Sequence, residues 1–142
     1  MDTGEVRKRL LQAIDQAKRT IAAHRAEADL ASRQYEPFLE TTAAPVFRQV
    51  SDALKAEGHG FQVYTPAGSV RLASDRSADD FVELALDTSR SPVALVARTS
   101  LARGRRVLAS ERVIHEGPDL DRVTDERVLG VLLEEVVPLI TR

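Results

Sequence analysis

Hydrophobic residues in the first quarter of the chain recur at alternating steps of four and three, the spacing of one face of a long α-helix. Residues 6–35 contain no proline and no glycine, and helix formers such as Ala, Arg, Glu and Leu dominate. We therefore predict a helix of about 30 residues, which at 1.5 Å per residue is ~45 Å long. Its heptad stripe has two rows, with Ile14, Ile21, Ala28 and Tyr35 in one and Leu10, Ala17, His24 and Ala31 in the other.

A second helix is predicted after Pro37, which interrupts the first run. Thr42 is placed to cap this helix, and Gly58 or Gly60 is placed to end it. The residues on its apolar face are Val46, Phe47, Val50 and Leu54. Because the two runs are separated by a proline break, we expect residues 1–58 to form an antiparallel helical hairpin, with His24 along its seam.

From residue 60 onward the hydrophobic period changes from helical spacing to two, which predicts strands. The five expected strands lie within residues 61–64, 70–73, 80–87, 92–99 and 105–115. Pro66 and Gly68 mark a tight hairpin turn between the first two. The connections are too short for a parallel crossover, so residues 60–115 are expected to form an antiparallel meander sheet.

The end of the chain predicts one more helix over residues 124–141, capped by Thr124 and kinked or ended by Pro138. Its wide apolar face includes Val128, Leu132, Val136 and Leu139. Such a face needs cover, and one side of the sheet is the simplest cover. The pattern as a whole therefore predicts a single α+β domain over residues 1–142.

Composition and charge exclude several classes of function. The 142 residues carry 20 basic and 22 acidic side chains, and a net charge of -2 gives no overall attraction to nucleic acid or to an anionic membrane. Cysteine is absent, which excludes disulfides and thiolate chemistry. No stretch has the length and apolar character of a membrane span. We expect a cytoplasmic protein.

Motifs of catalysis are missing from the sequence. There is no nucleophile elbow, no P-loop and no dinucleotide-binding fingerprint, and the three histidines are far apart. The best candidates for metal ligands are Glu111, His115, Glu116, Asp119 and Asp121. Their spacing is equally typical of a strand that ends in a polar loop, so we expect no catalytic, cofactor or metal site. An enzyme or a small-ligand pocket is the least favoured function.

The heptad stripe is the first candidate for a functional surface. The predicted helix is longer than the core of so small a domain requires, and leftover apolar length favours a partner, most often a second copy of the chain. The expected interface residues are Leu10, Ile14, Ala17, Ile21, His24 and Ala28. His24 either fixes register and pH response at the seam or is an ordinary, partly exposed histidine. We therefore predict a non-enzymatic protein that acts by association, as a homodimer or homo-oligomer or with another protein.

A group of arginines near the last strand is the alternative surface. The expected anion-binding residues are Arg98, Arg103, Arg105, Arg106 and Arg112. Three of them surround Gly104, and such a turn can hold a phosphate of an anionic ligand or a nucleic acid. Nucleic-acid proteins usually add aromatic stacking platforms or a basic total charge, and this chain has neither. The arginines thus rank below the stripe.

Overall fold

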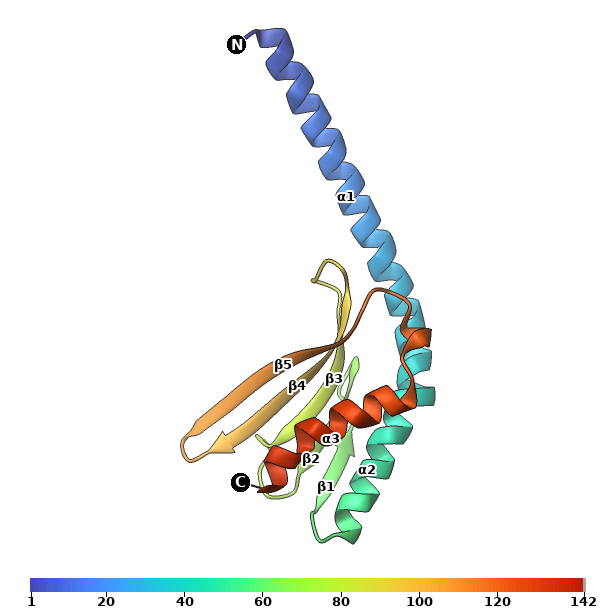
Figure 1. The fold of residues 1–142 in the computed structure, drawn as a ribbon, viewed down its shortest axis with the longest axis vertical. Coiled ribbons are helices and arrows are strands. Elements are labelled where there is room, and N and C mark those ends of the chain that lie inside the picture. The colour runs from blue at the N-terminus through green and yellow to red at the C-terminus, as the bar shows by residue number, and fades with distance from the viewer. Residues whose placement is uncertain (142) are drawn as a thin grey trace.

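A computed structural model of the protein describes residues 1–141 and shows an α+β fold (Figure 1). A long helical segment comes first, a five-stranded antiparallel sheet follows, and a helix packed on the sheet comes last. The helical elements are α1 (Thr3–Phe38), η1 (Leu39–Ala43), α2 (Ala44–Ala56), η2 (Leu120–Arg122) and α3 (Asp125–Thr141). The strands are β1 (Phe61–Tyr64), β2 (Ser69–Ser74), β3 (Phe81–Asp87), β4 (Ala94–Arg103) and β5 (Arg106–Glu116). The predicted α+β class, with a five-stranded antiparallel sheet and a C-terminal helix, is confirmed.

The antiparallel hairpin expected over residues 1–58 does not form. The chain instead stays helical from α1 through η1 into α2, where η1 is one turn of π-helix with a hydrogen bond from the Ala44 N–H to the Leu39 carbonyl. In a regular α-helix the ring of Pro45 would collide with the carbonyl of Thr41, and a wider π turn relieves this collision. The hydroxyl of Thr41 also donates to the carbonyl of Pro37 at 2.7 Å. The prolines therefore widen the helix locally without reversing it.

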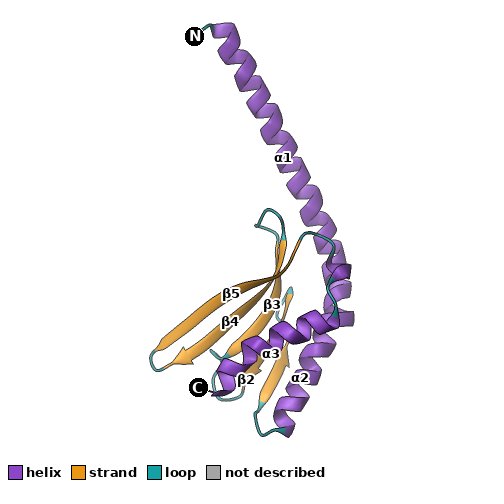
Figure 2. Cartoon of the chain, in the orientation of Figure 1, coloured by secondary structure: helices purple, strands orange, loops and turns teal. Residues whose placement is uncertain are grey.

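The sheet is a simple meander with the order β1-β2-β3-β4-β5, as the short connections predict. Every neighbouring pair is antiparallel, and one irregularity interrupts the β4–β5 register between Leu95 and Val96. β4 and β5 are the longest strands and extend past their neighbours as a hairpin (Figure 2). Because side chains alternate across a sheet, each strand contributes to both faces.

One face of the sheet is covered by α3, with α2 alongside it (Figure 1). The core between these layers contains Phe47 from α2, Leu72 and Leu84 from the strands, and Val128 and Leu132 from α3, all of them 2% exposed or less. This confirms that the C-terminal helix covers the sheet. The opposite face carries the row of charged residues described below.

The first part of α1 projects from the rest of the molecule as a single helix (Figure 1). We call residues 3–23 the arm and residues 24–141 the body. Every residue of the arm is exposed, and burial along α1 begins only at residue 24. Within residues 1–141 no helix combines the length and the apolar character needed to cross a membrane.

Candidate functional site

The arm carries an uncovered row of apolar side chains, which we call the arm stripe: Leu10, Ile14, Ala17 and Ile21. Leu10 is 58% exposed, Ile14 41% and Ile21 59%. Val6 and Leu11 flank the stripe and are equally open to solvent. Burying one such side chain is worth roughly 1.5–3 kcal/mol, so covering the stripe would release several kilocalories per mole.

Local interactions support the arm without covering its stripe. The carboxylate of Asp2 accepts from the Gly4 N–H at 3.3 Å and caps the helix. Ion pairs one turn apart join Arg9 to Glu5 at 3.1 Å and Arg19 to Asp15 at 3.0 Å. Pairs of this kind contribute about 0.3–0.5 kcal/mol each. In proteins most helical stability comes from the packing of an amphipathic face, and the exposed arm lacks such packing.

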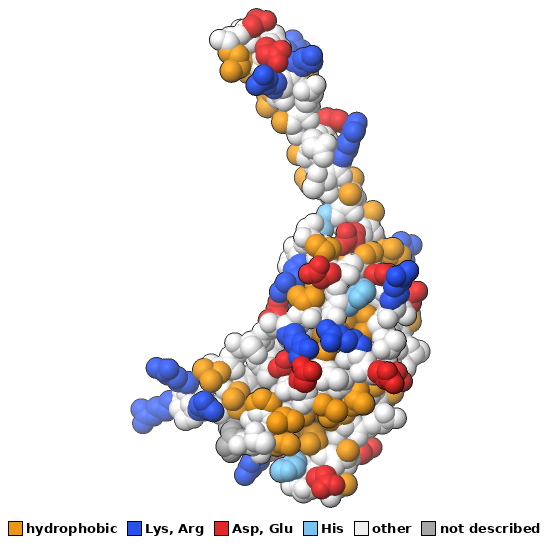
Figure 3. Space-filling view, in the orientation of Figure 1, with side chains coloured by type: hydrophobic (Ala, Val, Ile, Leu, Met, Phe, Trp, Pro, Cys, Tyr) orange, Lys and Arg blue, Asp and Glu red, His pale blue; other side chains and the backbone are white. Residues whose placement is uncertain are grey.

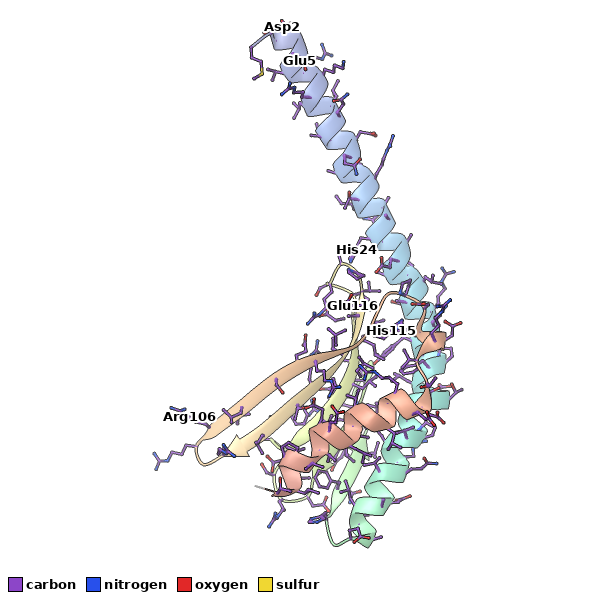
Figure 4. The ribbon with its side chains drawn as sticks, viewed as in Figure 1. Asp2, Glu5, His24, Arg106, His115 and Glu116 are labelled. Carbon is purple, nitrogen blue, oxygen red and sulfur yellow. The ribbon has the colours of Figure 1, made fainter. Side chains whose placement is uncertain are left out.

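The lower end of the heptad stripe packs against the body of the same chain. The Nε2 atom of His24 lies 2.9 Å from the carbonyl of Arg90, and Arg90 belongs to the loop between β3 and β4. His24 is labelled in Figure 4. Three residues on, the Glu27 carboxylate accepts from the Val93 N–H at 2.6 Å. Ala28 is partly buried, and Ala31 is fully buried. Two residues of the predicted interface, His24 and Ala28, thus lie at the junction of arm and body.

This junction was not predictable from the sequence, because the residues that meet there lie 66 positions apart. The acceptor at His24 is a backbone carbonyl, and the donor at Glu27 is a backbone amide. Backbone groups leave no signature in a side-chain pattern. The heptad pattern placed His24 along the seam of a helical hairpin, whereas the structure places it against the β3–β4 loop of the same chain.

The five predicted anion-binding arginines are divided by the sheet. Arg98 lies on the open face, where its Nε atom is 2.9 Å from the Glu111 carboxylate. Arg112 lies on the helix-covered face and pairs with Glu134 and Glu135 of α3. Neighbouring strand residues point to opposite faces, so a cluster in sequence is separated in space. The charges of Arg98 and Arg112 are balanced by these carboxylates.

The other three predicted arginines stay together at the tip of the β4–β5 hairpin. Arg103, Arg105 and Arg106 are exposed there, and Figure 3 shows basic side chains gathered at this protruding end. Arg106 is labelled at the tip in Figure 4 and points away from the body. Gly104 between them has φ 63°, a value that favours glycine and closes the tight turn. We call these three residues the tip arginines.

A row of alternating charges crosses the open face of the sheet from β2 to β5, one residue per strand. Arg71 pairs with Glu83 at 3.0 Å, and Arg98 with Glu111, in the register that the ladder sets. The guanidinium of Arg71 also lies 3.9 Å from the centre of the Phe81 ring. Hydrogen bonds from Arg98 first, and then from Arg90, lower the pKa of Glu111. The row is internally neutralised and therefore offers little attraction to an external ion.

The residues considered as metal ligands have other partners or remain dispersed. The Nε2 atom of His115 lies 2.8 Å from the Asp119 carboxylate, and this contact lowers the pKa of Asp119. Glu111 belongs to the charged row on the sheet. In the described part of the chain, no three His, Asp or Glu side chains gather in a way that would hold a metal ion.

A pocket of about 380 Å³ lies between η1 and the turn that joins β1 to β2. Two carboxylates, Glu36 and Glu40, and the guanidinium of Arg48 line it, together with the backbone of the turn. Beside it, the Tyr35 hydroxyl donates to the Gly68 carbonyl at 2.6 Å and ties the first hairpin to α1. The first hairpin is thus part of the scaffold.

No protein-family model, no curated protein and no solved structure matches this chain. The function is therefore inferred from the geometry of the arm, the sheet and the hairpin tip.

Proposed function

We propose that the protein is a non-enzymatic association protein that assembles with further copies of itself through the arm stripe. The observation that supports this most directly is a helix of 21 residues, 3–23, on which every residue is exposed while Leu10, Ile14 and Ile21 form one continuous apolar face. These residues add nothing to the core of the body, which begins with Ala31 and Tyr35. Exposed apolar faces of this kind are typical of interaction sites.

The proposal is tested by light scattering on the full chain after size-exclusion chromatography. We expect the wild-type protein to have a multiple of the mass of one chain, and Ile14→Asp with Ile21→Asp to shift it to a single chain, because two carboxylates would be buried in the interface. The matched control is Gln12→Asp with Ala26→Asp, which adds two carboxylates to the opposite side of the helix. A wild-type monomer at high concentration would contradict the proposal.

The tip arginines support a second candidate, the binding of an anionic ligand or a nucleic acid. They form an exposed basic group at the end of a protruding hairpin (Figure 3). Replacing Arg103, Arg105 and Arg106 by Ala should then shorten retention on a heparin column. The control replaces Arg33, Arg48 and Arg76, which are also exposed and remove the same charge. Equal retention of the two variants would exclude a specific role for the tip.

A further inference from the structure

We infer that the arms pair in antiparallel orientation across a two-fold axis near Gln12, so that the first turn of each arm lies beside residues 18–25 of the partner's arm. This inference rests on the proposed function, because it describes how the same stripe is covered by a second copy. Three features of the chain support it: the side of α1 on which the body lies, the position of Arg7 on the stripe, and the pairing of large and small side chains.

The position of the body argues against a parallel pair. The heptad stripe runs from Leu10 and Ile14 on the arm into His24 and Tyr35, which contact the β3–β4 loop and the first hairpin. The body therefore lies on the same side of α1 as the arm stripe, directly after the arm ends. Two parallel arms with facing stripes would bring both bodies into the same space between the helices. Antiparallel arms place the two bodies at opposite ends of the pair.

The loop at His24 also limits how far the arms overlap. Because the Arg90 carbonyl already contacts His24, a partner helix on the stripe can extend only to about this level. The free length is 21 residues, 3–23, or ~31 Å at 1.5 Å per residue. An axis near Gln12 uses nearly all of this length and leaves the junction intact.

The charges along the arm disfavour the parallel orientation. Arg7 lies on the row of Ile14 and Ile21, whereas Glu5 and Arg19 lie on the opposite side of the helix and already pair with Arg9 and Asp15. Parallel arms would place Arg7 beside its own copy, and like charges at an interface disfavour pairing. Antiparallel arms place Arg7 beside the partner's small Ala17.

The apolar side chains also match under this alignment. An axis near Gln12 places Leu10 opposite the partner's Ile14, with Leu11 beside the partner's Leu11. The centre of the interface is then formed by the large side chains. Towards each end a large residue meets a small one, as Ile21 meets the partner's Thr3. Layers of large against small residues allow close helix packing.

The chain lacks cysteine, so single introduced cysteines report directly on which positions meet. We would oxidise Ile21→Cys alone, Thr3→Cys alone, and an equimolar mixture of the two with one variant tagged. In an antiparallel pair, two copies of residue 21 are separated by about 27 Å, beyond the reach of a disulfide. We expect the mixture to give the tagged–untagged dimer and either variant alone to stay mostly uncrosslinked.

A second set of variants covers the case in which Ile21→Cys weakens association. Ala17→Cys, a small change, should crosslink to Arg7→Cys and not to itself. Ready self-crosslinking of Ala17→Cys and Ile21→Cys would show parallel arms, which overturns the antiparallel inference and leaves association through the stripe in place. A monomer by light scattering with no crosslink overturns both. A monomer whose arm binds vesicles of anionic phospholipid also overturns both and assigns the stripe to a lipid surface.

Discussion

Single residues of this protein show how strand alternation determines which charges meet. Arg98 and Arg112 lie in the same basic stretch of sequence, yet one pairs with Glu111 on the open face and the other with Glu134 on α3. The acidic partners were visible in the sequence, but the pairing requires the ladder register, which places Arg98 opposite Glu111. An arginine cluster in a strand is thus a poor predictor of a basic surface. In the turn around Gly104, where alternation ends, the tip arginines stay together.

Tyr35 gives a residue-scale prediction about stability and its dependence on pH. Its hydroxyl donates to Gly68, and burial raises the pKa of the phenol well above its usual range. Replacing Tyr35 by Phe should lower the free energy of unfolding by about 0.5–1.5 kcal/mol at neutral pH, as urea denaturation would measure. A folded-state pKa above the unfolded value, roughly 10, means that this contribution is present below pH ~10 and is lost as the pH rises further.

The matched control for Tyr35 is the other tyrosine of the chain. Tyr64 is 53% exposed, so Tyr64→Phe should change the free energy of unfolding by less than about 0.5 kcal/mol. Wild type and Tyr35→Phe should converge in stability as the pH rises from about 10 to about 11, because the Tyr35 phenol then ionises in the unfolded chain but stays protonated in the folded protein. A constant difference in the free energy of unfolding between wild type and Tyr35→Phe over that pH range would contradict the raised pKa of Tyr35.

Secondary-structure elements were predictable to different degrees. The strands, their meander order and the C-terminal helix followed from period and connection length, because these signals are local. The continuity of α1 into α2 was not predictable, since Pro37 and Pro45 are normally signs of a break. The outcome depends on tertiary cover: Tyr35, Phe38 and Phe47, before and after the π turn, pack into one core. That shared core favours continuation of the helix over reversal.

The role of α3 as the cover of the sheet can be tested with two adjacent leucines. Leu132 is 2% exposed in the core, whereas its neighbour Leu133 is 46% exposed. Leu132→Ala should lower the free energy of unfolding by about 2–5 kcal/mol, because it leaves a cavity against the strands. Leu133→Ala removes the same atoms from a solvent-facing position and should cost less than about 1 kcal/mol. Equal losses in urea denaturation would mean that α3 packs in a different orientation.

At the scale of the whole molecule, the protein consists of a body with its own core and an arm without one. The sequence predicted the residues of the arm stripe, because heptad spacing is independent of what covers it. It did not show that α2 leaves the stripe uncovered, because that depends on the direction of the chain after Pro37. In the structure the whole arm stripe is uncovered, because the hairpin expected to shield part of it is absent.

The arm and the body should respond differently to dilution of the protein. In proteins most helical stability comes from the packing of an amphipathic face, so an unpaired arm should be less helical than an arm stabilised by its partner. Far-ultraviolet circular dichroism at 222 nm should therefore show helicity falling as the protein is diluted through its dissociation constant, while the near-ultraviolet signal of the body stays constant. Ile14→Asp with Ile21→Asp should show the low helicity at every concentration, and Gln12→Asp with Ala26→Asp should follow the wild type. The contradicting result is a protein that dissociates by light scattering while its helicity stays constant. The arm would then be helical without a partner, and pairing would not be what orders it.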